Sequence, residues 1–278
     1  MSFTYAKAGV NVAKIKGIQG LIQQMTKKTK NKYMLPIYGH YAGLLKIKNQ
    51  QLALHTDSAG TKVLVAQYLG KYDTIGIDAV AMNVNDIICI GANPIALLDY
   101  LALEKDDESL VYEIMKGLVK GAREAKCSIV GGETAIMPDV IKGLEGKTGF
   151  DLACTCLGIL EKKITGSEIR EGDLIIGLRS SGLHSNAYSL ARKVLPLGSW
   201  AKELLTPTKI YVKPIMQTVK KLRISGLANI TGGAFSKLTR LNQKHGFLLH
   251  SMPEPNEIFE EIQKRAKLSD REMYRTFN

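Results

Sequence analysis

Segments with the apolar period of a helix alternate along this 278-residue chain with short apolar runs that are typical of strands. The clearest helix pattern covers Asp106–Ala125, where apolar residues recur at helical spacing behind Asp106 or Asp107 as the N-cap. The other helices are predicted at Asp78–Cys89, Asn186–Leu195, Lys209–Leu222 and Ile258–Leu268. Strands are predicted within Leu44–Thr56, which reads as two short strands, and at Pro94–Leu103, Cys127–Val130, Phe150–Leu160 and Leu174–Leu178. This alternation predicts an α/β or α+β fold.

A polar, charged stretch at Glu161–Asp173 is the best candidate for a domain boundary. It divides the chain into an N-terminal domain at residues 1–165 and a second domain at residues 166–278. Within the second domain, Pro214 must mark either the start of its helix or a kink in it.

Composition excludes several classes of protein. Hydrophobic residues make up 45% of the chain and charged residues 23%, so a disordered chain is excluded. No run of about 18 apolar residues occurs, and we expect no membrane partner. The N-terminus lacks the apolar segment of a secretory signal, and the four cysteines form no C-x-x-C pair. A reducing, cytoplasmic location fits this pattern best.

The net charge of +12 is concentrated near the N-terminus. Residues 1–56 hold nine lysines and no acidic residue, whereas the rest of the chain carries 29 basic against 26 acidic groups. A basic arm can bind nucleic acid. However, the chain uses 29 lysines and nine arginines, and arginine is the better residue for bidentate phosphate contacts. We therefore expect no nucleic-acid partner.

Familiar nucleotide and hydrolase motifs are missing from the sequence. There is no G-x-G-x-x-G, no H-E-x-x-H and no G-x-S-x-G. Gly146-Lys147-Thr148 imitates the end of a P-loop, but Ile141 stands where the first glycine is required. Dinucleotide-binding, zincin and α/β-hydrolase functions therefore have no support.

Acidic residues beside glycine-rich turns form the main chemical pattern of the first half. Asp57 follows a predicted strand and leads into Gly60-Thr61-Lys62, whose N–H groups, hydroxyl and ammonium suit phosphate oxygens. Asn85 and Asp86 lie opposite the apolar face of a predicted helix, and Gly131-Gly132-Glu133 follows a buried strand. Each element alone is compatible with a structural turn or an exposed pair. Together, three separated carboxylates suggest a site for Mg²⁺ and a triphosphate.

The second half has two polar turns that precede predicted helices. Ser180-Ser181-Gly182-Leu183-His184-Ser185-Asn186 offers hydroxyl and N–H groups at a helix start, and Thr231-Gly232-Gly233 offers a second turn of this kind. Plain helix caps and turns are the alternative interpretation. His184 and His40 are the two histidines in polar, glycine-flanked contexts.

Taken in order, these segments resemble the aminoimidazole ribonucleotide synthetase (phosphoribosylformylglycinamidine cyclo-ligase) family. The resemblance covers nearly the whole chain. It comprises Tyr5–Val10, Thr56–Asp57, Gly60–Lys62, Asp73–Asp78, Asn85–Asp86, Gly91–Pro94, Leu98–Tyr100, Val130–Ala135, Met137–Pro138, Ser180–Asn186, Thr231–Gly233 and Glu272–Asn278. Two departures are Ser58-Ala59, where the family usually has Gly-Val, and Asn11, where it has aspartate.

The resemblance implies a two-domain ATP-dependent synthetase fold, with the N-terminal sheets of two subunits pairing in a homodimer. It implies ATP and Mg²⁺ as cofactors and a small phosphorylated substrate, formylglycinamidine ribonucleotide, whose imidazole ring is closed to give aminoimidazole ribonucleotide. ATP would phosphorylate the formamide oxygen, and the amidine nitrogen would then attack the activated carbon.

Specific roles for residues are expected on the same basis. The expected metal ligands are Asp57, Asp86 and Glu133, and the expected ATP-binding residues are Gly60, Thr61, Lys62, Asn85, Gly131 and Gly132. The expected substrate-binding residues are Ser180, Ser181, His184, Asn186, Thr231, Gly232 and Gly233, with His184 and Lys62 as catalytic residues.

Two other functions remain as alternatives. One is a different ATP enzyme of the same superfamily, such as thiamine-phosphate kinase or selenophosphate synthetase, although the latter expects a reactive cysteine or selenocysteine near the N-terminus and no cysteine precedes Cys89. The other is a basic nucleic-acid-binding protein. Family members continue beyond the Met-Tyr-Arg-Thr-Phe-Asn motif, where this chain stops, so we expect an incomplete second domain that is loose and poorly active.

Overall fold

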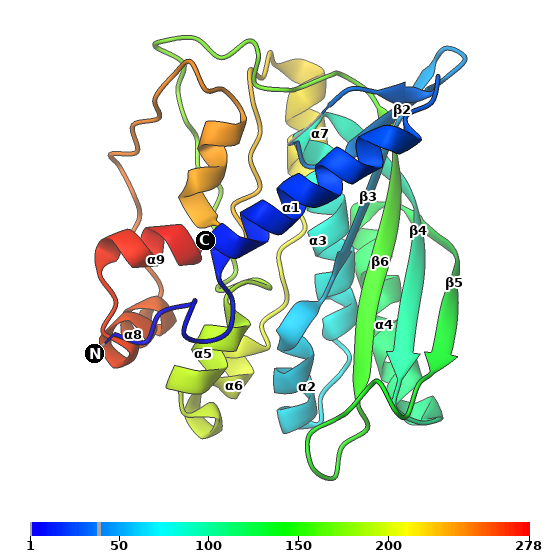
Figure 1. The fold of residues 1–278 in the computed structure, drawn as a ribbon, viewed down its shortest axis with the longest axis vertical. Helices are drawn as coiled ribbons and strands as arrows, with labels where there is room; N and C mark the ends of the chain where they lie inside the picture. Colours follow the sequence, from blue (N-terminus) through cyan, green and yellow to red (C-terminus); the bar gives the residue numbers. More distant parts are fainter. Residues whose placement is uncertain (1, 38–39) are drawn as a thin grey trace.

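The computed structural model describes residues 2–37 and 40–278, and it packs one β-sheet, a pair of long helices and a helical C-terminal part against one another (Figure 1). The strands are β1 Met34–Leu35, β2 Gly43–Ile47, β3 Gln50–Ser58, β4 Ala92–Leu103, β5 Ser128–Ile136 and β6 Phe150–Leu160. The α-helices are α1 Val12–Thr26, α2 Val63–Leu69, α3 Ile75–Cys89, α4 Glu108–Ala125, α5 Tyr188–Val194, α6 Leu197–Leu204, α7 Val212–Lys221, α8 Glu257–Ala266 and α9 Asp270–Thr276. Short 3₁₀ helices are η1 Lys27–Thr29, η2 Gly60–Lys62 and η3 Ala234–Arg240.

The six strands form one sheet in the order β1-β2-β3-β6-β4-β5. Neighbouring strands are antiparallel except β4 and β5, which are parallel and are joined through α4. A parallel pair needs such a crossover, because a tight turn cannot return the chain to the same end of the sheet. The sheet thus confirms the predicted mixture of α and β structure.

Helix α3 lies at the centre of the molecule. Every residue of Ile75–Cys89 is buried, because the sheet covers one side of the helix and the C-terminal part covers another (Figure 1). Its contact with α4 depends on glycine, since a Cβ atom on Gly76 would lie 2.2 Å from the backbone nitrogen of Leu118. Polar side chains on a helix so enclosed must find partners inside the protein.

The face of the sheet opposite α3 and α4 is open. Leu54, Leu98 and Tyr100 point to this face and keep 39%, 47% and 40% of their surface exposed. Strand β5 is an edge strand, and most of its residues are exposed. An apolar face beside an unpaired strand edge is a surface that a partner can cover.

Most predicted elements are present, with two corrections. The strand predicted at Cys127–Val130 extends to Ile136, because β5 pairs with β4 as far as Leu103. Gly131, Gly132 and Glu133 therefore lie within a strand rather than in a turn. The prediction of a strand at Leu174–Leu178 is wrong, since the structure pairs this segment with no other strand and leaves Leu174 90% exposed.

From residue 166 onward the described chain contains helices and irregular segments, and the strands lie between Met34 and Leu160. Pro214 is the third residue of α7, so it stands in the first turn of that helix. Its missing N–H is tolerated there, because the first turn lacks helical acceptors. Among the described residues, no helix is both long and apolar enough to cross a membrane.

Candidate active site

Helix α3 brings two polar clusters into contact with the C-terminal part of the chain. The first surrounds Asp78 in the first turn of the helix, and the second surrounds Asp86 near its end. Between them, Asn85 donates to the backbone oxygen of Lys209 at 2.9 Å and accepts from the backbone nitrogen of Tyr211 at 3.0 Å. The polar face that the sequence places on this helix therefore lies at an internal junction.

The first cluster is built on a buried ion pair. Nζ of Lys62 lies 2.8 Å from Oδ1 of Asp78, and neither side chain has any exposed surface. The same ammonium donates to the backbone oxygens of His184 at 2.9 Å and Thr206 at 2.6 Å. All three N–H groups of Lys62 are thus used inside the protein, so the expected contact with ATP phosphates is not available in this arrangement.

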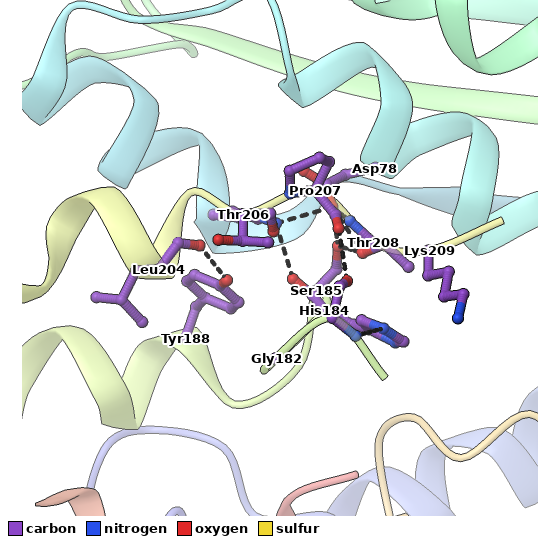
Figure 2. A network of polar contacts seen from close by, with 12 residues as sticks. Asp78, Gly182, His184, Ser185, Tyr188, Leu204, Thr206, Pro207, Thr208 and Lys209 are labelled. Carbon is purple, nitrogen blue, oxygen red and sulfur yellow. Dashed lines mark hydrogen bonds and ion pairs between the residues drawn. The ribbon is translucent and has the colours of Figure 1, made fainter. Parts of the chain in front are cut away.

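Oδ1 of Asp78 accepts further hydrogen bonds from the later part of the chain (Figure 2). The donors are the backbone nitrogen and hydroxyl of Thr208, at 2.7 and 2.6 Å, and the hydroxyl of Ser185 at 3.2 Å. Burial lowers the pKa of Lys62, and the attraction of Asp78 opposes that shift. The carboxylate therefore connects α3 to two separate segments of the C-terminal part.

His184 lies beside this pair and is 4% exposed. Its Nε2 accepts a hydrogen bond from the backbone nitrogen of Ser181 at 3.0 Å, and its ring centroid lies 6.2 Å from that of Tyr211. Burial first, and then the charges of Lys62 and Lys209, lower the pKa of His184 to about 3. The ring is neutral at physiological pH, and its proton belongs on Nδ1, because Nε2 is an acceptor.

The second cluster surrounds Asp86, which is 8% exposed. One carboxylate oxygen accepts from Nδ2 of Asn229 at 2.7 Å, and the other lies 3.4 Å from Nε2 of His55. Burial raises the pKa of Asp86, and the nearby charge of Lys237 opposes this shift. Lys237 is itself buried and donates to the hydroxyl of Thr231.

Of the three expected metal ligands, Asp57 and Asp86 lie on the same side of the sheet. Asp57 pairs with the buried Cys154 on the face that α3 covers, and its charge contributes to the raised pKa of Asp86. Glu133 instead pairs with the exposed Tyr100, on the opposite face. Within residues 2–37 and 40–278, no group of three His, Cys, Asp or Glu side chains could hold a metal ion. One chain therefore does not bring the three carboxylates together.

The expected glycines have different surroundings. Gly60 has a φ of +61°, so the turn before Thr61 and Lys62 suits glycine, and the Thr61 hydroxyl lies 3.4 Å from that of Ser189. A Cβ atom on Gly132 would lie 2.4 Å from Oδ1 of Asp99, whereas one on Gly131 would have only an ordinary contact at 3.6 Å. Gly132 thus makes room for a neighbouring side chain.

The two polar turns of the second half lie close together. A Cβ atom on Gly232 would be 3.6 Å from Oδ1 of Asn186, and the Nδ2 of this 7%-exposed asparagine has no hydrogen-bond partner. Gly233 has a φ of +88°, in the turn that leads from Thr231 into η3. The Ser181 hydroxyl donates to the backbone oxygen of Pro207 at 2.7 Å. The Ser180 hydroxyl accepts from the backbone nitrogen of Gly182 at 3.3 Å.

The residues of the two clusters that were not selected as site residues from the sequence include Asp78, Thr208, Asn229 and Lys237. Asp78 carried a usable signal, since an aspartate beside apolar residues at the start of a helix stands on the same face as Asn85. The other three lie in segments with no chemical motif of their own. Only the contact with α3 identifies them.

Two cavities lie apart from these clusters. One of about 490 Å³ lies between Glu161–Lys162 and Val219–Arg223, and one of about 400 Å³ is lined by residues that include His40, Thr165 and Arg240. No residue expected in the site lines either cavity. His40 lines the second of these cavities.

Comparison with known proteins gives a consistent result over almost the whole chain. Residues 39–160 match the model of the AIR synthase related protein, N-terminal domain, and residues 170–278 match that of its C-terminal domain. A phosphoribosylformylglycinamidine cyclo-ligase of Saccharolobus solfataricus is 47% identical over 100% of this chain and 84% of its own length. Enzymes of the same name from Methanocaldococcus jannaschii and Pyrococcus furiosus are each 48% identical, over 99% of this chain and 82% and 85% of their own lengths.

Solved structures show the same fold at lower sequence identity. A thiamine monophosphate kinase from Aquifex aeolicus superposes with a TM-score of 0.65 at 20% identity, covering 93% of this chain and 84% of the kinase. AaThiL in complex with AMPPCP and TMP gives a TM-score of 0.67 at 18% identity, with 93% and 81% coverage. These likenesses concern the fold.

Proposed function

The chain belongs to the phosphoribosylformylglycinamidine cyclo-ligase family, and we propose that it closes the imidazole ring of formylglycinamidine ribonucleotide at the two clusters on α3. The reaction is an ATP-dependent C–N bond formation in purine biosynthesis. The observation that carries the placement is that α3 contacts the second half at two points, Asn229 through Asp86 and Ser185 through Asp78.

Asp57 and Asp86 would hold Mg²⁺ together with the phosphates of ATP. The donor set fits this ion, which usually takes one or two carboxylates and fills its remaining positions with water and phosphate oxygens. Asn83 adds support, since its Oδ1 is buried without a partner while its Nδ2 donates to the backbone oxygen of Asp57 at 3.1 Å. Bound Mg²⁺ would neutralise the charge of the phosphates. Glu133 could join this set only from another chain.

Asn186 and the turn from Thr231 to Gly233 would bind the phosphate of the substrate. The unpaired Nδ2 of Asn186 is a buried donor, and an unpaired buried donor is costly unless a ligand supplies an acceptor. Gly232 lies beside this amide and offers a backbone without a side chain. Ser180 and Ser181 would border the site.

His184 would act as a neutral hydrogen-bond donor through Nδ1 rather than as a general acid. Its pKa of about 3 leaves almost no imidazolium at physiological pH. A neutral donor can orient the reacting formamide without supplying a second charge. Lys62 would hold His184 in place rather than bind a ligand. Its ammonium already donates to three acceptors of the protein, one of which is the backbone oxygen of His184.

A second copy of the chain would cover the open face of the sheet and form a homodimer. Leu54, Leu98 and Tyr100 are exposed on that face, beside the unpaired edge of β5. Glu133 lies on the same side as Tyr100 and would then approach the partner. We place the enzyme in the cytoplasm, because its four cysteines are unpaired and suit a reducing compartment.

The test measures phosphate released from ATP and Mg²⁺ by the purified protein, with and without formylglycinamidine ribonucleotide. Release that depends on this substrate and matches the amount of aminoimidazole ribonucleotide formed supports the function. A parallel reaction contains thiamine monophosphate, because phosphorylation of that compound, as by the kinase that shares the fold, is the alternative function. ADP formation with thiamine monophosphate, and none with formylglycinamidine ribonucleotide, would overturn the ring-closing function.

A further inference from the structure

We propose that Lys62 and Asp78 are positioning residues, which act on the reaction by fixing the backbone and ring of His184. The proposal rests on the function proposed above, because it assigns His184 to the reacting group. Lys62 and Asp78 themselves would touch neither ATP nor the substrate. Their ion pair instead determines where the second half of the site stands relative to α3.

The pair is connected to three points of the C-terminal part. Lys62 donates to the backbone oxygens of His184 and Thr206, and Asp78 accepts from the backbone nitrogen of Thr208. The Thr208 and Ser185 hydroxyls add two further bonds to the same carboxylate oxygen. These partners lie in irregular segments before and after α5 and α6, so neither a helix ladder nor a sheet holds them. The ion pair therefore fixes backbone segments that no helix or sheet holds in place.

Among the residues bonded to the ion pair, His184 is the one with a left-handed backbone. Its φ is +57°, in the left-handed region that residues with a side chain seldom adopt. The bond from Lys62 to its carbonyl oxygen favours this conformation, and the bond from the Ser181 nitrogen to Nε2 fixes the ring. The charged groups facing the ring are Lys62 and Lys209, and the ring of Tyr211 lies on a further side. Figure 2 shows His184 and Ser185 close to Asp78, Thr206 and Thr208.

Stability alone does not account for a pair that is so completely buried. Removing two charges from water is costly, and apolar residues of similar volume often serve a core equally well or better. An apolar pair, however, cannot form directed hydrogen bonds to particular backbone atoms. Because a small displacement of a reacting group can reduce the rate about a hundredfold, such bonds matter most beside the reacting group.

The experiment replaces the pair with apolar residues in the double variant Lys62→Met with Asp78→Leu. The matched control is Lys116→Met with Glu113→Leu, which removes a lysine–glutamate pair from the exposed surface of α4. Heteronuclear NMR of the histidine rings follows His184 from pH 4 to 8, and steady-state kinetics gives kcat and KM. The NMR measurement needs neither ATP nor turnover.

In the wild type and the control, the His184 ring should stay neutral and hold one chemical shift down to about pH 4. The double variant should fold, and its His184 ring should titrate at least one pH unit higher, with kcat reduced about a hundredfold and the KM for ATP changed less than threefold. Unchanged His184 shifts, with kcat within twofold of the wild type, would overturn the proposal.

Asp78→Asn keeps the test decisive if the double variant fails to fold. It keeps an oxygen that can accept the bonds from Lys62 and Thr208 while it removes the charge. Positioning predicts that this variant keeps the wild-type His184 shift and at least a tenth of kcat. A kcat reduced as far as a hundredfold with an unmoved ring would show that the charge, and not the position, matters. A wild type without turnover would refute the proposed function alone, because the ring shifts still report the positioning.

Discussion

The carboxylate of Asp86 lies 3.4 Å from Nε2 of His55, although α3 carries the first residue and β3 the second. Its other oxygen accepts from Asn229. A single acidic side chain thus contacts the sheet and the C-terminal part at once. Burial raises its pKa, so this carboxylate is less stable as an anion here than in water.

Asp86→Asn should weaken binding of ATP in the presence of Mg²⁺ at least tenfold while changing the free energy of unfolding by less than about 1 kcal/mol. The amide keeps an acceptor for Asn229 but is a poor replacement for a carboxylate at a cation. The loss of a buried charge offsets the loss of the contact to His55. Isothermal titration calorimetry and urea unfolding measure the two effects.

Asp106→Asn is the control for this variant, because Asp106 is exposed and lies just before the N-cap of α4. It should leave the affinity for Mg²⁺–ATP unchanged. Equal affinities in wild type and Asp86→Asn would remove Asp86 from the metal site. A large fall in stability with normal binding would assign it a structural role.

The buried, neutral ring of His184 predicts that acid destabilises the fold. Its pKa falls from 6.5 to about 3 on folding, so the unfolded chain binds the proton more tightly. The stability from this residue is present above pH 6.5 and is lost as the pH falls toward 3. The expected slope approaches about 1.4 kcal/mol per pH unit below pH 6.

Urea unfolding of the wild type and His184→Gln between pH 7.5 and 4.5 isolates this effect. The wild type should lose about 2.5 kcal/mol more than the variant over this range, because only one of the two carries the titrating ring. Parallel pH profiles for both proteins would show that His184 can be protonated in the folded state.

The sequence predicted the elements that carry their own pattern. The strand Phe150–Leu160 matches β6, and Asp107 caps α4 through the backbone nitrogen of Leu110, as the aspartate pattern predicted. The extension of β5 through two glycines was not predictable, because glycine disfavours strands locally and the pairing with β4 overrides that preference. The apolar segment Leu174–Leu178 has the composition of a strand, but a strand also needs a neighbouring strand to pair with, and the described structure gives this segment none.

The residues of the candidate site were easier to predict from the sequence than their arrangement in space. Acidic residues and glycines at turns are visible in a sequence, and Asn85 and Asp86 of the expected set do lie on α3. The sequence could not show that Lys62 spends its three N–H groups on acceptors that lie up to 144 residues away. Nor could it show that Glu133 and Asp57 lie on opposite faces of the sheet, since this depends on the register of four strands.

Leu98→Lys should convert the proposed homodimer into monomers. Leu98 lies in β4 on the open face of the sheet, and a lysine at a covered apolar face would bury an unpaired charge. Sedimentation velocity should show a fall to about half the wild-type mass. Tyr112→Lys, at a 67%-exposed position on α4, is the control and should sediment as the wild type. A wild-type protein that is already monomeric would refute the proposed dimer.

Gly132→Ala and Gly131→Ala should differ sharply although the two residues are neighbours in β5. The new Cβ at position 132 would lie 2.4 Å from Oδ1 and 2.6 Å from the backbone oxygen of Asp99, so β4 and β5 must separate locally. Such overpacking costs about 1–3 kcal/mol. At position 131 the nearest atom is Cδ2 of Leu98 at 3.6 Å, so alanine should be neutral or should stabilise the strand by about 0.5 kcal/mol.

Urea unfolding of both variants measures this difference, and Asp99→Ala in the Gly132→Ala background separates its two causes. Removing the Asp99 carboxylate should restore part of the lost stability, because the backbone oxygen remains too close. ATP titrations decide between packing and ligand binding. If Gly132 serves the nucleotide, alanine will lower ATP affinity at unchanged stability, and Asp99→Ala will not restore it. If Gly132 instead allows β4 to pack on β5, the free energy of unfolding will fall. The apparent affinity for ATP will then fall only in proportion to the loss of folded protein.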